Sequence, residues 1–173
     1  MNPALDKLLE QTKSENKEVQ EEAILAIAML LEKHSTRADK PSFYKEILPG
    51  HLLSITLSEY EQQELIAKLS TLIMSEKMTP SMIWALGKTT LNAALMSLLV
   101  LLNDRSCQFD EEATWQLLVA IDNALIIRNN GMLDPQVRSL IRCSNPTPSL
   151  RMIAEKGNPR LKKIAQNLLK RVV

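Results

Sequence analysis

The chain has 173 residues, of which 45% are apolar and 24% are charged, with a formal net charge of +1. This composition is typical of a folded globular domain and excludes a disordered charged tail. An aromatic content of 3%, with 29 leucines and four glycines, favours helix over sheet. We therefore expect one all-α domain over residues 1–173, large enough to bury a core without a disulfide or a metal.

Apolar residues recur at helical spacing along most of the chain, and turn-forming residues interrupt them. Between residues 35 and 57 the pattern is irregular, with Pro41, Pro49 and Gly50, and predicts only one or two short helical pieces. Elsewhere the pattern predicts, in chain order, helices over residues 3–13, 17–34, 59–77, 80–87, 91–103, 110–129, 134–143, 148–156 and 159–172.

The N-terminus and the most apolar stretch argue against secretion and membrane insertion. Asp6 and Lys7 fall where a secretory signal needs an apolar run. Residues 91–102 include Asn92 and Ser97 and are fewer than the about 20 residues that a membrane span needs. We therefore expect a cytoplasmic protein with no membrane partner.

Consecutive predicted helices pair into about five hairpins of about 35 residues each. Hairpins that cannot bury their own apolar faces stack in sequence and form helical solenoids. The sequence therefore predicts a solenoid.

The first and last hairpins carry a second, more specific pattern, Asp-x-x-Val-Arg-x-x-Ala-x-x-Ala-Leu-x-x-Leu. Near the N-terminus it is matched by Asn16, Val19, Gln20, Ala23, Ala26, Ile27 and Leu30, with Gln20 at the usual basic position. Near the C-terminus it is matched by Asn158, Pro159, Leu161, Lys162, Ala165, Leu168, Leu169 and Val172. Residues 134–138 also look like the start of such a helix. In these residues the chain resembles the HEAT and armadillo type helical repeats.

The resemblance implies a right-handed α-α superhelix of the HEAT/armadillo kind, with about five helical hairpins. It also implies a surface offered to other macromolecules, although one such fold hosts many uses. Residues 35–57 depart from the repeat pattern.

Charge is distributed unevenly. Residues 1–76 carry 8 basic and 13 acidic side chains, residues 77–135 carry 4 and 6, and residues 136–173 carry 9 and 1. The basic C-terminal helices are either a solvated cap or a surface for phosphates or an acidic protein. Within the apolar run 117–127, a polar pair marks either an exposed stripe or a polar spot in a groove. The candidate partner-binding residues are Arg138, Arg142, Arg151, Arg160, Lys163, Lys170 and Arg171, together with the pair Asp122 and Asn123.

No catalytic or metal-binding set can be assembled from the sequence. Gly87-Lys88-Thr89 copies the end of a phosphate-binding loop, but Met82 stands where that motif needs glycine, and residues 82–86 look helical. A glycine that ends a helix is the simpler interpretation. The remaining candidates stand apart from one another: His34, His51, Cys107 and Cys143. We expect no enzymatic activity, no metal and no cofactor.

Trp84 and Trp115 have apolar neighbours at helical spacing and are either core residues or exposed anchors for a partner. The favoured hypothesis is a protein–protein interaction module or adaptor whose partner the sequence does not name. The alternative is binding to the phosphate backbone of nucleic acid through the basic C-terminal helices. The oppositely charged ends also permit head-to-tail self-association, and the oligomeric state stays open.

Overall fold

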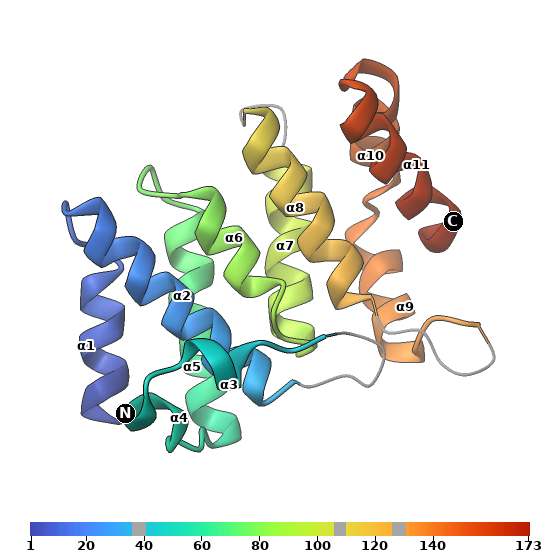
Figure 1. Ribbon diagram of the computed structural model, residues 1–173. Coiled ribbons are helices and arrows are strands. Elements are labelled where there is room, and N and C mark those ends of the chain that lie inside the picture. The colour runs from blue at the N-terminus through green and yellow to red at the C-terminus, as the bar shows by residue number, and fades with distance from the viewer. Residues whose placement is uncertain (36–40, 106–109, 126–130) are drawn as a thin grey trace.

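The computed structural model describes residues 1–35, 41–105, 110–125 and 131–173, and within them it contains eleven α-helices and no β-strand (Figure 1). The predicted all-α class is confirmed. The helix predicted over residues 110–129 is shorter than expected: it ends at Ala124, and Leu125 is already extended, while residues 126–130 and Cys107 lie outside the described residues. The helices are α1 (Pro3–Gln11), α2 (Lys17–Lys33), α3 (Tyr44–Ile47), α4 (Gly50–Leu53), α5 (Glu59–Ile73), α6 (Pro80–Leu86), α7 (Asn92–Arg105), α8 (Glu111–Ala124), α9 (Pro135–Ser144), α10 (Thr147–Lys156) and α11 (Pro159–Val172).

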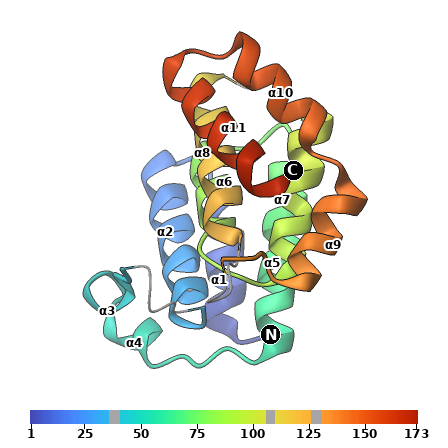
Figure 2. The same ribbon diagram turned by 90° about the vertical axis from the view of Figure 1, so that its right-hand side faces the viewer.

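The longer helices form two layers. In one, α2 packs against α6, α6 against α8, and α8 against α11; in the other, α5 packs against α7 and α7 against α9. Across the layers α1 pairs with α2, α5 with α6, and α7 with α8, while α10 pairs with α11. Figures 1 and 2 show these units following one another along a single axis, with the two termini towards opposite ends. We call α2, α6, α8 and α11 the second-helix layer.

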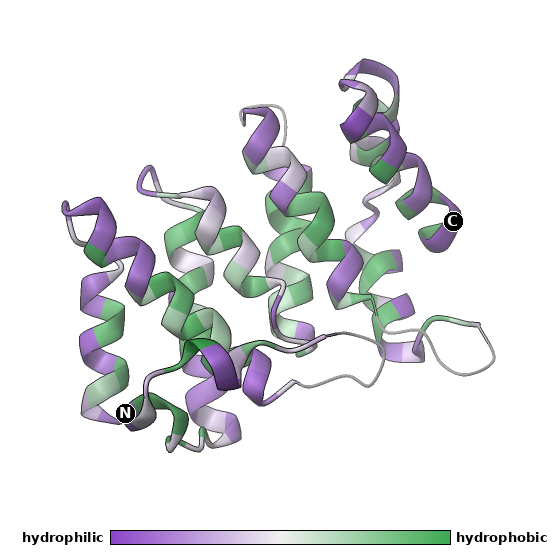
Figure 3. Ribbon diagram, in the orientation of Figure 1, coloured by the Kyte–Doolittle hydropathy of each residue, from purple (hydrophilic) through white to green (hydrophobic). Residues whose placement is uncertain are grey.

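The buried apolar residues form one cluster that includes helices of both layers, and Figure 3 shows hydrophobic residues concentrated on the central helices. The middle of α2 is apolar on nearly every side, and α1, α3, α4 and α6 all contact this helix. α6 and α7 are buried in the same way, whereas α10 and α11 bury one stripe each and are otherwise hydrophilic. The core is therefore continuous along the stack and thinnest at the C-terminal end.

Side-chain caps define where most of the helices begin. Each cap accepts a hydrogen bond from a backbone N–H of the first turn, which would otherwise have no partner. Ser58 also forms a capping box, in which the Glu61 carboxylate accepts from the Ser58 N–H at 3.0 Å. The other capping residues are Asn2, Asn16, Asp110, Asp134 and Asn158. α5 ends at Ile73 and is shorter than the predicted helix over 59–77.

The irregular segment 41–57 forms the short helices α3 and α4, and the end of α2 holds it in place. Glu32 is only 6% exposed, and its Oε2 accepts from the backbone N–H groups of Phe43 at 2.8 Å and Tyr44 at 3.1 Å. Its Oε1 lies 3.4 Å from Nζ of Lys88. A buried carboxylate needs such donors.

The next two residues, Lys33 at the end of α2 and its C-cap His34, bind the far end of the same segment. Nζ of Lys33 donates to the carbonyl oxygens of Leu53 at 2.8 Å and Ile55 at 2.6 Å. Nε2 of His34 accepts from the N–H of Leu57 at 2.9 Å. The ring of His34, which the sequence shows only as an isolated histidine, thus ties the end of α2 to the segment before α5.

Gly87 ends α6 as predicted, but for a different reason. A glycine that ends a helix usually adopts a positive φ, whereas Gly87 has φ −71° in the right-handed region. A Cβ at this position would lie 2.8 Å from both Cα and Cβ of Ala120 on α8. The glycine therefore permits the close approach of α6 and α8.

Candidate functional site

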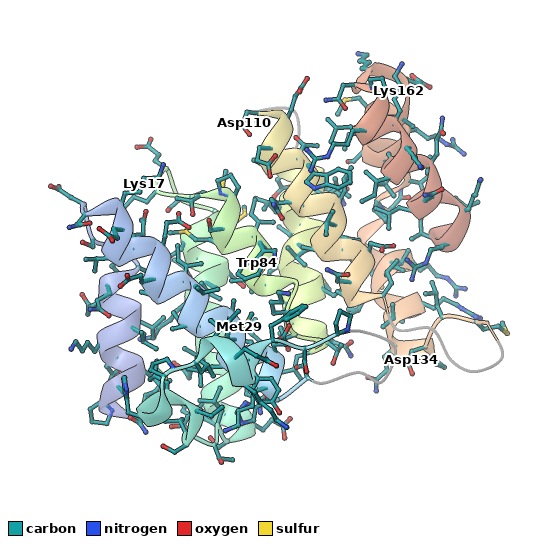
Figure 4. The ribbon with its side chains drawn as sticks, in the orientation of Figure 1. Lys17, Met29, Trp84, Asp110, Asp134 and Lys162 are labelled. Carbon is teal, nitrogen blue, oxygen red and sulfur yellow. The ribbon has the colours of Figure 1, made fainter. Side chains whose placement is uncertain are left out.

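A groove of about 800 Å³ crosses α2, α6 and α8 on the second-helix layer. Four carboxylates line it beside a single cation, Lys17, and the ring of Trp84 lies on α6 in its middle (Figure 4). We call this site the acidic groove, and its carboxylates are Glu18, Glu21 and Glu22 of α2 and Glu112 of α8.

Two of these carboxylates already have partners and two do not. Glu21 accepts from the hydroxyl of Ser81 at 2.6 Å, and Glu112 lies 3.6 Å from Arg160. Within the described part of the chain, Glu18 and Glu22 form no ion pair, and both are exposed. Two negative charges are therefore free to attract a positively charged ligand.

Local sequence explains why the carboxylates gather here. Asn16 accepts from the N–H groups of Glu18 and Val19, which starts α2 at this edge of the layer. Acidic residues near a helix N-terminus are stabilised by the helix dipole, so the position of Glu18 has a structural cause as well. Glu18 and Glu112 line the same groove only because α2, α6 and α8 pack side by side.

The sequence left open whether Trp84 and Trp115 are core residues or exposed anchors, and each of them is partly both. Both are half-buried and pack against the core, and both carry a cation over the ring. Nζ of Lys88 lies 4.8 Å from the Trp84 ring centre, and the Arg160 guanidinium lies 3.7 Å from that of Trp115. Trp84 also lines the acidic groove, so part of its ring is available to a ligand.

An apolar hollow of about 350 Å³ adjoins the acidic groove on the side of α3 and α4. Leu25 and Glu22 belong to both sites. Leu25 is 36% exposed and Ile47, on α3, is 42% exposed. The remaining apolar lining includes Val19, Ala26, Leu48 and Leu52. The two sites therefore form one continuous surface that is acidic at one end and apolar at the other.

The structure brings together four of the seven basic residues predicted to bind a partner. They line one cavity of about 640 Å³ between α9 and α11, which we call the basic cavity. Its cations are Arg138 and Arg142 of α9 with Lys170 and Arg171 of α11.

Two asparagines position the helices around the basic cavity. Asn145 ends α9 with φ 48°, a left-handed conformation that turns the chain into α10. Nδ2 of Asn103 on α7 donates to the carbonyl oxygen of Ser144 at 2.6 Å, and its Oδ1 accepts from Ser149 at 3.0 Å.

The other predicted basic residues lie elsewhere. Arg160 is over Trp115 and beside Glu112, at the boundary of α8 and α11. Arg151 and Lys163 are exposed and do not line the basic cavity. The single basic face inferred from the sequence is therefore divided into separate parts.

The two polar residues of α8, Asp122 and Asn123, also face different parts of the structure. Asp122 is half-buried and forms an ion pair with Arg171, which joins α8 to α11. Asn123 lines a smaller hollow together with Glu32 and Lys88. Asp122 therefore has a structural partner, and a role of either residue in binding stays a prediction.

The other residues considered for phosphate binding, metal binding or catalysis either have structural roles or do not lie together in a site. Residues 80–86 are helical, and Lys88 is engaged by Glu32 and Trp84, so Gly87-Lys88-Thr89 is not a phosphate-binding loop. Among the residues described, His, Cys, Asp and Glu form no group of three or more that could hold a metal ion. Cys143 is an exposed free thiol. None of the helices in the described ranges is long and apolar enough to cross a membrane.

No protein-family model and no curated protein matches this sequence. Solved structures do match its fold. A designed armadillo repeat protein, YIII(Dq.V1)4CPAF, in complex with peptide (KR)4 superimposes with a TM-score of 0.60 at 20% identity, over 98% of this chain and 64% of that one. The fold is an armadillo-like α-solenoid. A second designed armadillo repeat protein, YIII(Dq)4CqI, aligns with a TM-score of 0.45 at 22% identity, over 98% of this chain and 82% of that one. This chain thus spans less than two thirds of the first armadillo repeat protein.

Proposed function

We propose that this armadillo-like solenoid is a non-enzymatic protein-interaction module that binds an extended basic segment of a partner protein in the acidic groove. The observation that carries the proposal is the pair of exposed carboxylates without cation partners, Glu18 and Glu22, beside the half-buried ring of Trp84.

The chemistry of the groove selects a cationic ligand. Lysine or arginine side chains of a partner would neutralise Glu18 and Glu22, and an aliphatic stem or a guanidinium would pack on the Trp84 ring. The groove crosses three helices, so a ligand that contacts both its α2 and α8 walls is an extended segment rather than a single side chain. Surface charges attract a partner at a distance but are screened by salt, so binding should weaken as ionic strength rises.

The comparison with solved structures supports the same ligand class. The designed armadillo repeat protein with TM-score 0.60 is in complex with (KR)4, a peptide of alternating lysine and arginine. That likeness is one of fold, and the acidic groove supplies the charge complementarity for a similar peptide here.

The apolar hollow adds a second requirement for the partner. Because Leu25 and Glu22 belong to both sites, a segment seated in the groove continues over Leu25 and Ile47. Burial of an apolar side chain there contributes about 1.5–3 kcal/mol when it is complete. We therefore infer a segment with basic residues followed or preceded by a large apolar one.

The test measures the fluorescence anisotropy of a labelled (KR)4 peptide against the wild type and two variants. The groove variant, Glu18→Gln with Glu22→Gln, removes two carboxylates from the groove. The control variant, Glu59→Gln with Glu76→Gln, removes two exposed carboxylates, one at the start of α5 and one in the turn that follows this helix. Glu18 and Glu59 both lie in the first turn of a helix, so these two substitutions are matched in their effect on the helix dipole.

We expect the peptide to bind the wild type and the control variant alike and to bind the groove variant about tenfold more weakly. Equal weakening of both variants would mean that the peptide responds only to net charge, and would contradict the groove as the site. Tight binding of an acidic (DE)4 peptide, unaffected by the groove variant, would contradict the proposed ligand class.

Nucleic acid remains the second candidate, through the basic C-terminal helices. Backbone binding needs several cations free to contact successive phosphates. Arg160 and Arg171 instead have carboxylate partners on α8, Glu112 and Asp122. The cations of the basic cavity face a hollow of limited size, and this observation leads to a different ligand.

A further inference from the structure

We propose that the basic cavity between α9 and α11 is a binding site for a small phosphorylated molecule with two or more phosphoryl groups, of about nucleotide size. This site lies at the C-terminal end of the stack, shares no lining residue with the acidic groove and does not depend on the function proposed for that groove.

The charge of the cavity is the first step. Among the described residues, Arg138, Arg142 and Lys170 have no carboxylate partner, and no Asp or Glu lines the cavity. Arg138 and Arg142 stand four residues apart on α9, where like charges repel each other. A bound anion would remove this repulsion, so the cavity favours a ligand with several negative charges.

Arg171 supplies a donor without an acceptor. Its Nη1 forms the ion pair with Asp122, and its Nη2 lies 3.5 Å from the carbonyl oxygen of Leu125. Its Nε is buried and has no hydrogen-bond partner in the described part of the chain. A buried N–H without an acceptor costs free energy, and Arg171 lines the cavity, so a ligand oxygen can accept from this N–H once a shift of the side chain exposes it.

The arrangement of the cations points to more than one phosphoryl group. Arg138 and Arg142 lie about 6 Å apart along α9, and Lys170 and Arg171 belong to a different helix. Guanidinium groups bind phosphate oxygens in pairs, and the three cations without a carboxylate partner, Arg138, Arg142 and Lys170, carry more positive charge than the about −1.5 to −2 of one phosphoryl group balances. A diphosphate or triphosphate matches this distribution of charge better.

The size and the apolar wall decide between a small molecule and an extended polymer. A volume of about 640 Å³ is within the range of small-molecule sites. Apolar side chains share the lining with the cations, and these can contact the organic part of a phosphate ester: Met132, Leu133, Ile141 and Val172. A nucleic-acid backbone would instead need exposed cations in a row, and Arg151 and Lys163 lie outside the cavity.

The test is isothermal titration calorimetry of the whole chain with inorganic pyrophosphate, and then with adenosine triphosphate. The cavity variant is Arg138→Gln with Arg142→Gln, and the control variant is Arg151→Gln with Lys163→Gln. Each removes two exposed positive charges from the same end of the chain, and circular dichroism verifies that both variants keep their helices.

We expect pyrophosphate to bind the wild type and the control variant equally and to bind the cavity variant at least about tenfold more weakly. Tighter binding of adenosine triphosphate than of pyrophosphate would support a contribution of the apolar wall. The proposal is overturned if neither probe binds the wild type, or if both variants weaken binding equally.

A third probe, a single-stranded oligonucleotide, distinguishes the source of the phosphates. One outcome is that the oligonucleotide binds without competition from pyrophosphate, with its binding weakened equally by the cavity variant and the control variant. In that case the basic helices bind a polymer backbone, and the proposed small-molecule site is wrong. Competition by pyrophosphate, with loss only in the cavity variant, supports the compact site.

Discussion

Replacing Gly87 by alanine tests the close packing of α6 against α8. The new Cβ would lie 2.8 Å from both Cα and Cβ of Ala120, whereas ordinary contact begins at 3.4 Å. The two helices must therefore separate by about 0.6 Å, the difference between these distances. A gap of this size forfeits a quarter or more of the dispersion energy of each facing contact, and overpacking of this kind costs about 1–3 kcal/mol.

Thermal unfolding followed by circular dichroism measures the cost. For a chain of this length each kcal/mol lowers the Tm by about 2–4 °C, so Gly87→Ala should lower it by about 2–12 °C. Gly50→Ala is the matched control, because a Cβ on Gly50 meets nothing within 4 Å. If Gly87→Ala were as stable as the wild type, or if Gly50→Ala were destabilised as much, the close approach would not be the reason for glycine.

Two further predictions concern carboxylates. Glu32→Gln should lower the free energy of unfolding, measured by urea titration, by about 1–3 kcal/mol. The substitution removes the charge that faces Lys88 and weakens the hydrogen bonds from the backbone N–H groups of segment 41–57. The Ser58 backbone N–H holds the pKa of Glu61 below its ordinary value of 4.5, so the ionised carboxylate adds stability above pH 4.5, which is lost as the pH falls through the lowered pKa. The stabilities of the wild type and Glu61→Gln should thus differ more at pH 7 than at pH 3; a constant difference would contradict the capping box.

The helices could be predicted because their causes are local. Periodic apolar residues place each helix, and caps such as Ser58 and Asp110 fix where it begins. Helix ends were less predictable, since α5 ends at Ile73 while its apolar pattern suggests a longer helix.

The attachment of segment 41–57 was not predictable, because it depends on contacts between distant residues. Glu32 and His34 reach backbone N–H groups 11 to 23 positions away, and nothing in the periodicity specifies these partners. One signal was present: Glu32, Lys33 and His34 are three consecutive hydrogen-bonding side chains directly before a segment without helical pattern.

Departures from the repeat pattern also have long-range causes. Gln20 stands where HEAT and armadillo type repeats usually have a basic residue, and its Nε2 donates to the carbonyl oxygen of Thr12 at 2.9 Å. Thr12 is fully buried at the end of α1, so this carbonyl has no access to water. A glutamine at this position is thus explained by the hydrogen bond that it donates to the preceding helix of the same hairpin.

The sequence indicated the basic residues of one candidate site but did not indicate the acidic groove. The excess of cations after residue 136 is visible in the sequence, but the convergence of Arg138 and Lys170 on one cavity depends on how α9 and α11 pack. The acidic groove was missed, because the helix dipole alone accounts for carboxylates at the start of α2. Their meeting with Trp84 follows only from the order of helices in the second-helix layer.

The opposite charges of the two sites bear on self-association. A head-to-tail contact between copies would be heterologous, because the groove and the cavity are different surfaces, and would build rings or open chains. Both sites are hollow: the groove carboxylates line about 800 Å³ and the cavity cations about 640 Å³. Two concave surfaces cannot fill each other, so their charges stay separated by water, whose high dielectric constant, together with screening by salt, makes the attraction weak. We therefore expect the mass measured by light scattering to be the same at about 0.05 M and 0.5 M salt. A mass that rises with protein concentration at low salt and falls at high salt would show that the two ends do bind each other, and that protruding side chains rather than the hollows carry the attraction.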